Sequence, residues 1–304
     1  MNGSDKLWGI DLGGTKIEGV VLASAENPEV LCRHRVPTEA NQGYEHVLGQ
    51  VQKLVNVLQN ETGESPQRIG IGTPGICMPS TGLMKNCNAT ALNGKPMKAD
   101  LEKLLGIEVR MANDANCFAL AEATMGAVKQ DFPDAKVVFG VILGTGVGGG
   151  VVVNGQLING RHAIGGEWGH NYLPGFEGRD CFCGKKGDNE SVLSGPSLEW
   201  YYAQQSGQQK PLKEIVTLAR EGKDAVAVAT LDRLIAGFGM AISVVVNILD
   251  PDVIVIGGGV GNISELYTKG VEAIAPNVFD GTFEGAVVKP KLGDSAGVFG
   301  AAFL

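Results

Sequence analysis

Two glycine-rich turns of similar composition lie far apart in this chain, and together they constrain the fold more than any other feature. Asp11-Leu12-Gly13-Gly14-Thr15 follows an apolar run from Leu7, and Leu143-Gly144-Thr145-Gly146-Val147-Gly148-Gly149-Gly150 follows one from Val137. Each pattern predicts a strand, a tight turn and a second strand. Because glycine has no Cβ, such turns expose backbone N–H groups to an anion. Two of them indicate a polyphosphate that is bound from both sides.

Length, charge and hydropathy narrow the class of protein. The 304 residues can bury two hydrophobic cores, so two lobes are expected. A net charge of −8 disfavours nucleic acid and anionic membrane surfaces as partners. No apolar run reaches the roughly 20 residues of a membrane-spanning helix, and residues 1–6 carry no signal-peptide core. We therefore expect a cytoplasmic protein with no nucleic-acid partner and no membrane partner.

Hydrophobic periodicity predicts an α/β protein, because strand-like runs open each half of the chain and helix-like runs follow them. The predicted strands lie at 7–11, 17–22, 30–36, 68–72, 107–111, 137–143, 149–153, 253–256 and 287–288. The predicted helices lie at 44–59, 98–105, 115–127, 197–205, 212–220, 225–249, 263–273 and 296–303. Residues 155–195 are irregular, which is typical of functional or cross-linked segments. We expect the hinge between the lobes near residues 113–135.

Asp11 and Asp114 are the carboxylates best placed for chemistry. Asp11 ends the first strand beside a glycine turn, where a carboxylate suits Mg²⁺ held through water. The alternative is that Asp11 accepts hydrogen bonds from the turn itself. Asn113-Asp114 stands between a strand and a helix, so both residue types suit a helix N-cap. If Asn113 is the cap, Asp114 is left to act as a general base toward a sugar hydroxyl.

The irregular segment contains a polar motif and a cysteine motif. Glu167 and His170 could both face one pocket and bind a polyol, and the alternative is a solvated loop. Cys181 and Cys183 follow His170 closely, which gives three ligands for Zn²⁺, and Asp188 is the candidate for the fourth. A reduced, metal-free pair of cysteines is the alternative.

Six motifs, in this order, resemble the ROK family (repressors, open reading frames and kinases), and specifically its sugar kinases. They lie at residues 11–16, 72–75, 113–116, 143–150, 166–170 and 250–259, so the resemblance covers essentially the whole chain. It implies an actin-like ATPase (ribonuclease H-like) fold with two α/β lobes around a deep cleft, usually in a homodimer. The first lobe would span residues 1–115, completed by a C-terminal helix at 296–304. The second would span 116–295 and carry a zinc loop at 160–190.

The resemblance also implies a role for each motif. Asp114 would take the proton from a hexose hydroxyl. The sugar's other contacts would come from several motifs: Gly75, Asn113, Glu167, His170 and Glu190. ATP and Mg²⁺ would be bound by the two glycine turns and an adenosine-side element: Asp11, Gly13, Gly14, Thr15, Lys16, Gly144, Thr145, Gly146, Gly257, Gly258 and Gly259.

Asp188 departs from the family's zinc segment, which reads Cys-x-Cys-Gly-x-x-Gly-Cys-x-Glu. It stands where the third cysteine belongs, whereas Glu190 keeps its place. A carboxylate oxygen is a harder ligand than a thiolate, so zinc should be held less tightly or in an altered geometry. We expect a structural Zn²⁺ bound by His170, Cys181, Cys183 and Asp188, which would fix the loop that carries His170 and Glu190.

Two loops bear on the choice of hexose. Residues 84–96 and 170–174 are similar to bacterial fructokinases of the family, which often also accept mannose or glucose, so D-fructose is the expected substrate. A glucokinase or an N-acetylglucosamine kinase is the alternative. A DNA-binding repressor is disfavoured, because only ten residues precede Asp11 and the chain is acidic. A catalytically silent sugar sensor stays open, since binding residues alone do not prove turnover.

Overall fold

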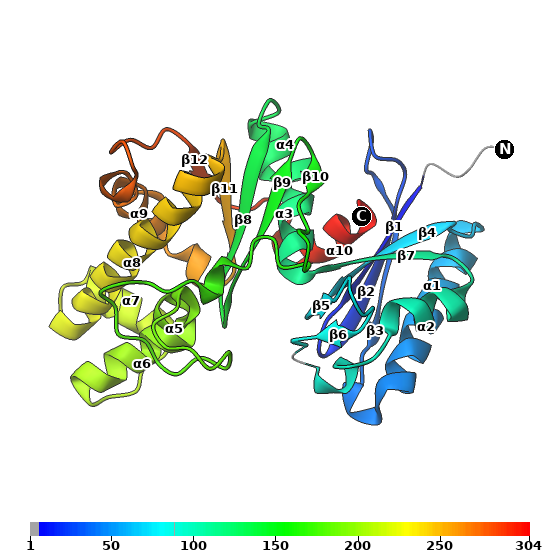
Figure 1. The fold of residues 1–304 in the computed structure, drawn as a ribbon, viewed down its shortest axis with the longest axis horizontal. Coiled ribbons are helices and arrows are strands. Elements are labelled where there is room, and N and C mark those ends of the chain that lie inside the picture. The colour runs from blue at the N-terminus through cyan, green and yellow to red at the C-terminus, as the bar shows by residue number, and fades with distance from the viewer. Residues whose placement is uncertain (1–5, 88) are drawn as a thin grey trace. The chain divides into compact units, whose positions relative to one another are not determined.

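The computed structural model describes residues 6–87 and 89–304 (Figure 1), and the contacts within it divide the chain into two compact units. The first unit consists of Met1–Asp131, Gly150–Gly165 and Lys291–Leu304, and the second of Phe132–Gly149 and Gly166–Pro290. Residues 1–5 of the first predicted lobe, Asn88 of the substrate segment and the side chain of Asp294 lie outside the described part. The lobe boundaries expected from the sequence stay a prediction.

A five-stranded mixed sheet forms the core of the first unit, in the order β3-β2-β1-β4-β7. Its strands are β1 (Leu7–Leu12), β2 (Lys16–Leu22), β3 (Val30–Pro37), β4 (Arg68–Thr73) and β7 (Glu108–Asn113). β1, β4 and β7 run parallel, whereas β2 pairs antiparallel with both β1 and β3. The carboxyl ends of parallel strands meet at one edge of a sheet, so the residues after β1 and β7 come together there.

Helices cover both faces of this sheet. Figure 1 shows α1 (Tyr44–Thr62) and α2 (Met97–Leu105) on one face, and α10 (Ala296–Ala302) with α3 (Asp114–Thr124) on the other. α1 buries the apolar stripe that its sequence predicts, including Val51, Leu54 and Leu58. On the opposite face, a Cβ added at Gly9 would lie 2.4 Å from the carbonyl oxygen of Val298. Glycine in β1 therefore allows α10 to approach the sheet closely.

The second sheet has the order β10-β9-β8-β11-β12. Its strands are β8 (Val137–Leu143), β9 (Val147–Val153), β10 (Gln156–Leu157), β11 (Val253–Gly257) and β12 (Ala286–Val288). β11 pairs in parallel with both β8 and β12, and the boundary between the units falls within β9. The helices of the second unit are α5 (Asn189–Leu193), α6 (Gly195–Ser206), α7 (Leu212–Arg220), α8 (Ala225–Leu249) and α9 (Lys269–Glu272).

Within the described residues, α8 is the one helix long and apolar enough to cross a membrane, with a mean hydropathy of 1.6. Half of its most apolar window is buried inside the protein. The expectation that no apolar run reaches the length of a membrane-spanning helix is therefore wrong for α8. The core helix of a soluble protein passes the same test, so the feature is weak evidence for a membrane span.

Two predicted helices are wrong in extent. The helix expected at 263–273 is broken, because Thr268 has φ −125° and ψ −90°, and only α9 remains α-helical there. The helix expected at 115–127 ends at Thr124, and a separate α4 (Ala127–Asp131) follows. A Glu122 carboxylate oxygen accepts a hydrogen bond from the Ala127 N–H at 2.7 Å, which caps α4.

The segment expected to be irregular, 155–195, is partly ordered. It contains β10, a 3₁₀ turn at Trp168–His170 and the short helix α5. The small antiparallel pair β5 (Ile76–Cys77) and β6 (Met84–Lys85) was not predicted, because two-residue strands carry no measurable periodicity.

Candidate active site

The first glycine turn joins β1 to β2 and is exposed. The Gly13 N–H donates to the Lys16 carbonyl oxygen at 3.0 Å, which closes the turn, and the Thr38 hydroxyl donates to the Gly13 carbonyl oxygen at 2.7 Å. A Cβ added at Gly14 would meet no atom within 4 Å. The turn is therefore anchored at one end and open at its tip, as a loop that binds phosphate through N–H groups requires.

Asp11 and Asp114 lie at the same edge of the first sheet, since β1 and β7 are parallel strands separated by β4. The side-chain oxygen of Asn113 accepts a hydrogen bond from the Asn116 N–H at 2.8 Å and so caps α3. The N-cap of α3 is therefore Asn113 and not Asp114. Asp114 is exposed, and one of its oxygens accepts a hydrogen bond from the Ala115 N–H at 2.8 Å. Capping of α3 therefore does not need the Asp114 carboxylate.

Both carboxyl groups have raised pKa values. Desolvation, followed by the negative charges of Asp114 and Glu18, raises the pKa of Asp11 to about 6, against an opposing contribution from Lys16. Desolvation also raises the pKa of Asp114, against a lowering contribution from its backbone hydrogen bond to Ala115. Two neighbouring carboxyl groups with raised pKa values are typical of a site that binds a cation or moves a proton.

The pKa of Asp11 predicts how activity depends on pH. Should Asp11 hold Mg²⁺ through water, as the resemblance to the ROK family implies, its carboxylate must be ionised, and kcat/KM for MgATP would then fall by about tenfold for each pH unit below about 6. A pH–rate profile from 5 to 8 at constant ionic strength checks this, with Asp11→Asn as the comparison that lacks this ionisation. A profile that stays flat down to pH 5 would contradict it.

The same shift has a consequence for stability. Because the folded chain binds this proton more tightly than the unfolded chain, Asp11 favours folding at low pH. That contribution is lost as the pH rises from the ordinary value of 3.8 through about 6.

Gly75 lies where a side chain would not fit. A Cβ there would lie 2.6 Å from both the Lys85 carbonyl oxygen and the Cys87 sulfur. The Thr73 hydroxyl donates to the Gly75 carbonyl oxygen at 2.8 Å, and this hydrogen bond holds the loop after β4. Glycine is required here for packing, whether or not the backbone also contacts a ligand.

In the second unit, the second glycine turn lies beside the glycines that follow β11. The Gly144 N–H donates to the Gly146 carbonyl oxygen at 2.9 Å, and the Gly195 N–H donates to the Gly144 carbonyl oxygen at 2.9 Å. Gly258 has φ 87°, and a Cβ there would lie 2.2 Å from the Leu143 carbonyl oxygen. The fold thus brings together two glycine segments, 144–146 and 257–259, that the sequence singled out separately.

The segment with Glu167 and His170 packs tightly on β9. The Trp168 indole N–H donates to the Gly148 carbonyl oxygen at 2.9 Å, and a Cβ added at Gly169 would lie 1.9 Å from the Val147 carbonyl oxygen. A large buried aromatic ring and a glycine therefore fix this segment against the strand that follows the second glycine turn.

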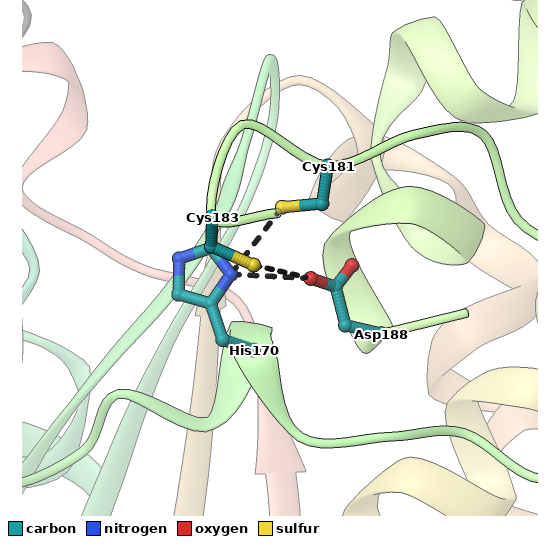
Figure 2. A group of neighbouring side chains, drawn as sticks. All are labelled: His170, Cys181, Cys183 and Asp188. Atoms are coloured by element: carbon teal, nitrogen blue, oxygen red, sulfur yellow. Dashed lines mark hydrogen bonds and ion pairs between the residues drawn. The ribbon is translucent and has the colours of Figure 1, made fainter. Parts of the chain in front are cut away.

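His170, Cys181, Cys183 and Asp188 come together in the second unit, with side chains that point toward one another (Figure 2). Asp188 Oδ2 lies 3.3 Å from His170 Nδ1 and 3.4 Å from Cys183 Sγ, and Cys181 Sγ lies 3.6 Å from His170 Nδ1. Ligand atoms of a tetrahedral zinc lie about 3.5 Å from one another. The separations and the nitrogen, sulfur and oxygen donors therefore fit the zinc ion expected from the sequence.

The sequence did not indicate one contact of Glu190, a candidate sugar-binding residue. The Val147 N–H, directly after the second glycine turn, donates to Glu190 Oε2 at 3.0 Å. These residues are 43 positions apart, so no local pattern could have indicated the contact. It links the helix beside the cysteine motif to the glycine turn.

A model of the ROK family matches residues 7–304. The chain is 38% identical over 306 residues to an N-acetyl-D-glucosamine kinase of Vibrio atlanticus (strain LGP32), covering 98% of each chain. It is similar to the solved ROK hexokinase from Thermus thermophilus, with a TM-score of 0.87 and 31% identity over 98% of this chain and 96% of that one.

A ROK family glucokinase from Streptomyces griseus, solved in complex with glucose and AMPPNP, is also similar, with a TM-score of 0.74 and 26% identity over 98% of each chain. These likenesses confirm the predicted fold class, the actin-like ATPase fold.

Proposed function

The chain belongs to the ROK family, and we propose that it is an ATP-dependent kinase that phosphorylates the 6-hydroxyl of N-acetyl-D-glucosamine. One observation carries the chemistry: Asp11 and Asp114 lie at one edge of the parallel strands β1, β4 and β7, next to the exposed turn 13–16. A carboxylate suited to Mg²⁺ and one suited to accepting a proton are what phosphoryl transfer to a hydroxyl requires.

Each candidate residue has a proposed role. Asp114 accepts the proton of the 6-hydroxyl, and Asn113 keeps Asp114 at the start of α3 by capping that helix. Asp11 would hold Mg²⁺ through water, and the ion would supply positive charge that neutralises the phosphates. The sugar contacts come from Gly75, Asn113, Glu167, His170 and Glu190. The phosphates are bound by Gly13, Gly14, Thr15, Lys16, Gly144, Thr145 and Gly146, and the adenosine side by Gly257, Gly258 and Gly259.

N-acetyl-D-glucosamine is one of the alternative sugars that the sequence left open, and the prediction of fructose finds no support. That prediction depended on loops at 84–96 and 170–174, whereas the 38% identical relative over 98% of both chains is an N-acetyl-D-glucosamine kinase. Identity over the whole chain reports on all the sugar contacts together, and two short loops report on few of them. Hexose isomers differ by a few hydrogen bonds, which short segments do not specify.

A structural Zn²⁺ is part of the proposal. The donor set of His170, Cys181, Cys183 and Asp188 fits it, with all four ligand atoms within 4.8 Å of one another. Zinc would hold the loop so that His170 and Glu190 keep their orientation. Asp188 replaces a soft thiolate by a harder carboxylate oxygen, so zinc should bind more weakly than it would to three thiolates and a histidine.

A homodimer is also part of the proposal. Exposed apolar side chains on the second unit support it: Val244 and Ile248 on one face of α8, and Phe279, which is 96% exposed. Phe279 lies next to that face, because its N–H donates to the Asn247 side chain at 2.9 Å. A grouped apolar surface of this kind usually marks a contact with another chain.

The test is ADP release with MgATP against N-acetylglucosamine, glucose, mannose, fructose and N-acetylmannosamine. We expect kcat/KM for N-acetylglucosamine to exceed that for each other sugar by about tenfold or more. The highest value on fructose would restore the loop-based prediction and contradict the substrate proposed here. Sugar binding by calorimetry without ADP release on any sugar would contradict the kinase and favour the silent sensor.

A further inference from the structure

Asp188 makes two different contacts with its two carboxylate oxygens. Oδ2 faces the cluster, at 3.3 Å from His170 Nδ1 and 3.4 Å from Cys183 Sγ (Figure 2). Oδ1 accepts a hydrogen bond from the Ser191 N–H at 2.8 Å and is the N-cap of α5. The residue is 1% exposed, so solvent does not replace either contact easily. A cysteine has a single sulfur atom, so one atom would have to make both the contact with the cluster and the contact with the helix.

Helix α5 depends on this cap more than a longer helix would. It has five residues, which is too short to be stable without outside contacts. The Ser191 hydroxyl donates to the Asp188 carbonyl oxygen at 2.9 Å, so the side chain and the backbone carbonyl of Asp188 both hold the first turn of α5. Any change in how firmly the Asp188 carboxylate is held therefore acts directly on α5.

Helix α5 in turn reaches the second glycine turn through Glu190. Glu190 Oε2 accepts the Val147 N–H at 3.0 Å, and a Cβ added at Gly146 would lie 2.7 Å from the same oxygen. The Ser197 hydroxyl donates to the Glu190 carbonyl oxygen at 2.8 Å and holds the helix from the other side. The carboxylate of Glu190 thus packs directly against the turn that we propose binds phosphate.

We propose that Asp188 couples Zn²⁺ occupancy of the cluster to the order of the turn at 144–146, through α5 and Glu190. Zinc fixes Oδ2, which restricts the carboxylate and holds Oδ1 in its capping position. α5 then holds Glu190 against the Val147 N–H. The inference rests on the proposed function only for the choice of Zn²⁺ and for the role of the turn. Asp188 and Glu190 are positioning residues in this coupling.

Hydrogen exchange of the full-length protein, with and without Zn²⁺ after chelator treatment, tests the coupling without sugar or ATP. We expect Zn²⁺ to slow amide exchange by about threefold or more in two peptides, one covering 144–149 and one covering 189–194. Competition with a chromogenic chelator measures zinc affinity in the same samples. Because neither readout uses the reaction, a wrong substrate proposal would leave both results unchanged.

Three variants separate the steps of the coupling. Asp188→Asn keeps an oxygen that can cap α5 but offers zinc a neutral amide, so zinc affinity should fall by about tenfold or more and the zinc effect on both peptides should disappear. Glu190→Ala should keep the zinc affinity and the response in α5 but lose the response at 144–149. Asp180→Asn is the matched control, since Asp180 is an exposed carboxylate of the same loop, paired with Lys186 at 2.8 Å.

Three outcomes would overturn the proposal. The first is wild-type protein that binds less than about a tenth of an equivalent of zinc. The second is full zinc binding with unchanged exchange at 144–149. The third is an Asp188→Asn variant that retains the wild-type zinc affinity and exchange response.

Discussion

Replacing Asp114 by alanine is expected to lower kcat for sugar phosphorylation by roughly 10²–10⁴-fold, the usual contribution of a general base. Asp114 follows β7 at the sheet edge shared with Asp11, and its raised pKa makes it a better proton acceptor than an ordinary aspartate. Asn113 caps α3 through its own side chain, so the helix keeps its cap in the variant. Steady-state ADP release gives kcat, and calorimetry gives the sugar Kd, which should change by less than about threefold if Asp114 acts mainly in the transition state.

Two further variants make this result decisive. Asp114→Asn retains the shape of the side chain and should lose nearly as much kcat as alanine, because an amide cannot accept the proton at neutral pH. Asp134→Ala, at an exposed carboxylate of the second unit, should leave kcat within about twofold. An Asp114→Ala enzyme with near-normal turnover would contradict the assignment of Asp114 as the base.

Much of the fold follows from local patterns in the sequence. The stripe in α1 predicts which residues it buries, and the apolar run from Leu7 predicts β1 with Asp11 near its end. The pair Asn113-Asp114 allowed two interpretations, a helix N-cap and a general base. Both depended on a boundary between a strand and a helix, and β7 does end where α3 begins. These features are predictable because the interactions that decide them act within a few residues of the chain.

Features that depend on distant contacts could not be predicted in this way. α4 starts where the Glu122 carboxylate accepts the Ala127 N–H, and the same carboxylate accepts the Leu292 N–H at 3.0 Å, 170 positions away. The contact between Val147 and Glu190 is of the same kind. Substrate preference belongs here too, because it depends on hydrogen bonds from several segments at once, and the two short loops that favoured fructose find no support in the 38% identical relative.

The closest approach between α10 and the first sheet predicts the largest effect on stability. Gly70 lies in β4, between β1 and β7, and a Cβ added there would lie 1.7 Å from the Ala301 carbonyl oxygen and 3.1 Å from the Leu304 Cβ. Neither β4 nor α10 can move away freely, since β4 is paired on both sides and α10 also packs on α3. Gly70→Ala should therefore lower the free energy of unfolding by about 3 kcal/mol, at the upper end for overpacking.

Urea unfolding followed by circular dichroism measures this effect as a lower midpoint at unchanged m-value. Gly49→Ala is the matched control, because Gly49 lies inside α1 and a Cβ there meets no atom within 4 Å. That substitution should stabilise the protein by up to about 1 kcal/mol, since alanine favours helix over glycine. The opposite signs exclude a general effect of replacing glycine. A Gly70→Ala protein as stable as wild type would mean that α10 does not pack on β4 as closely as described, because no side-chain rotation can remove a clash with backbone.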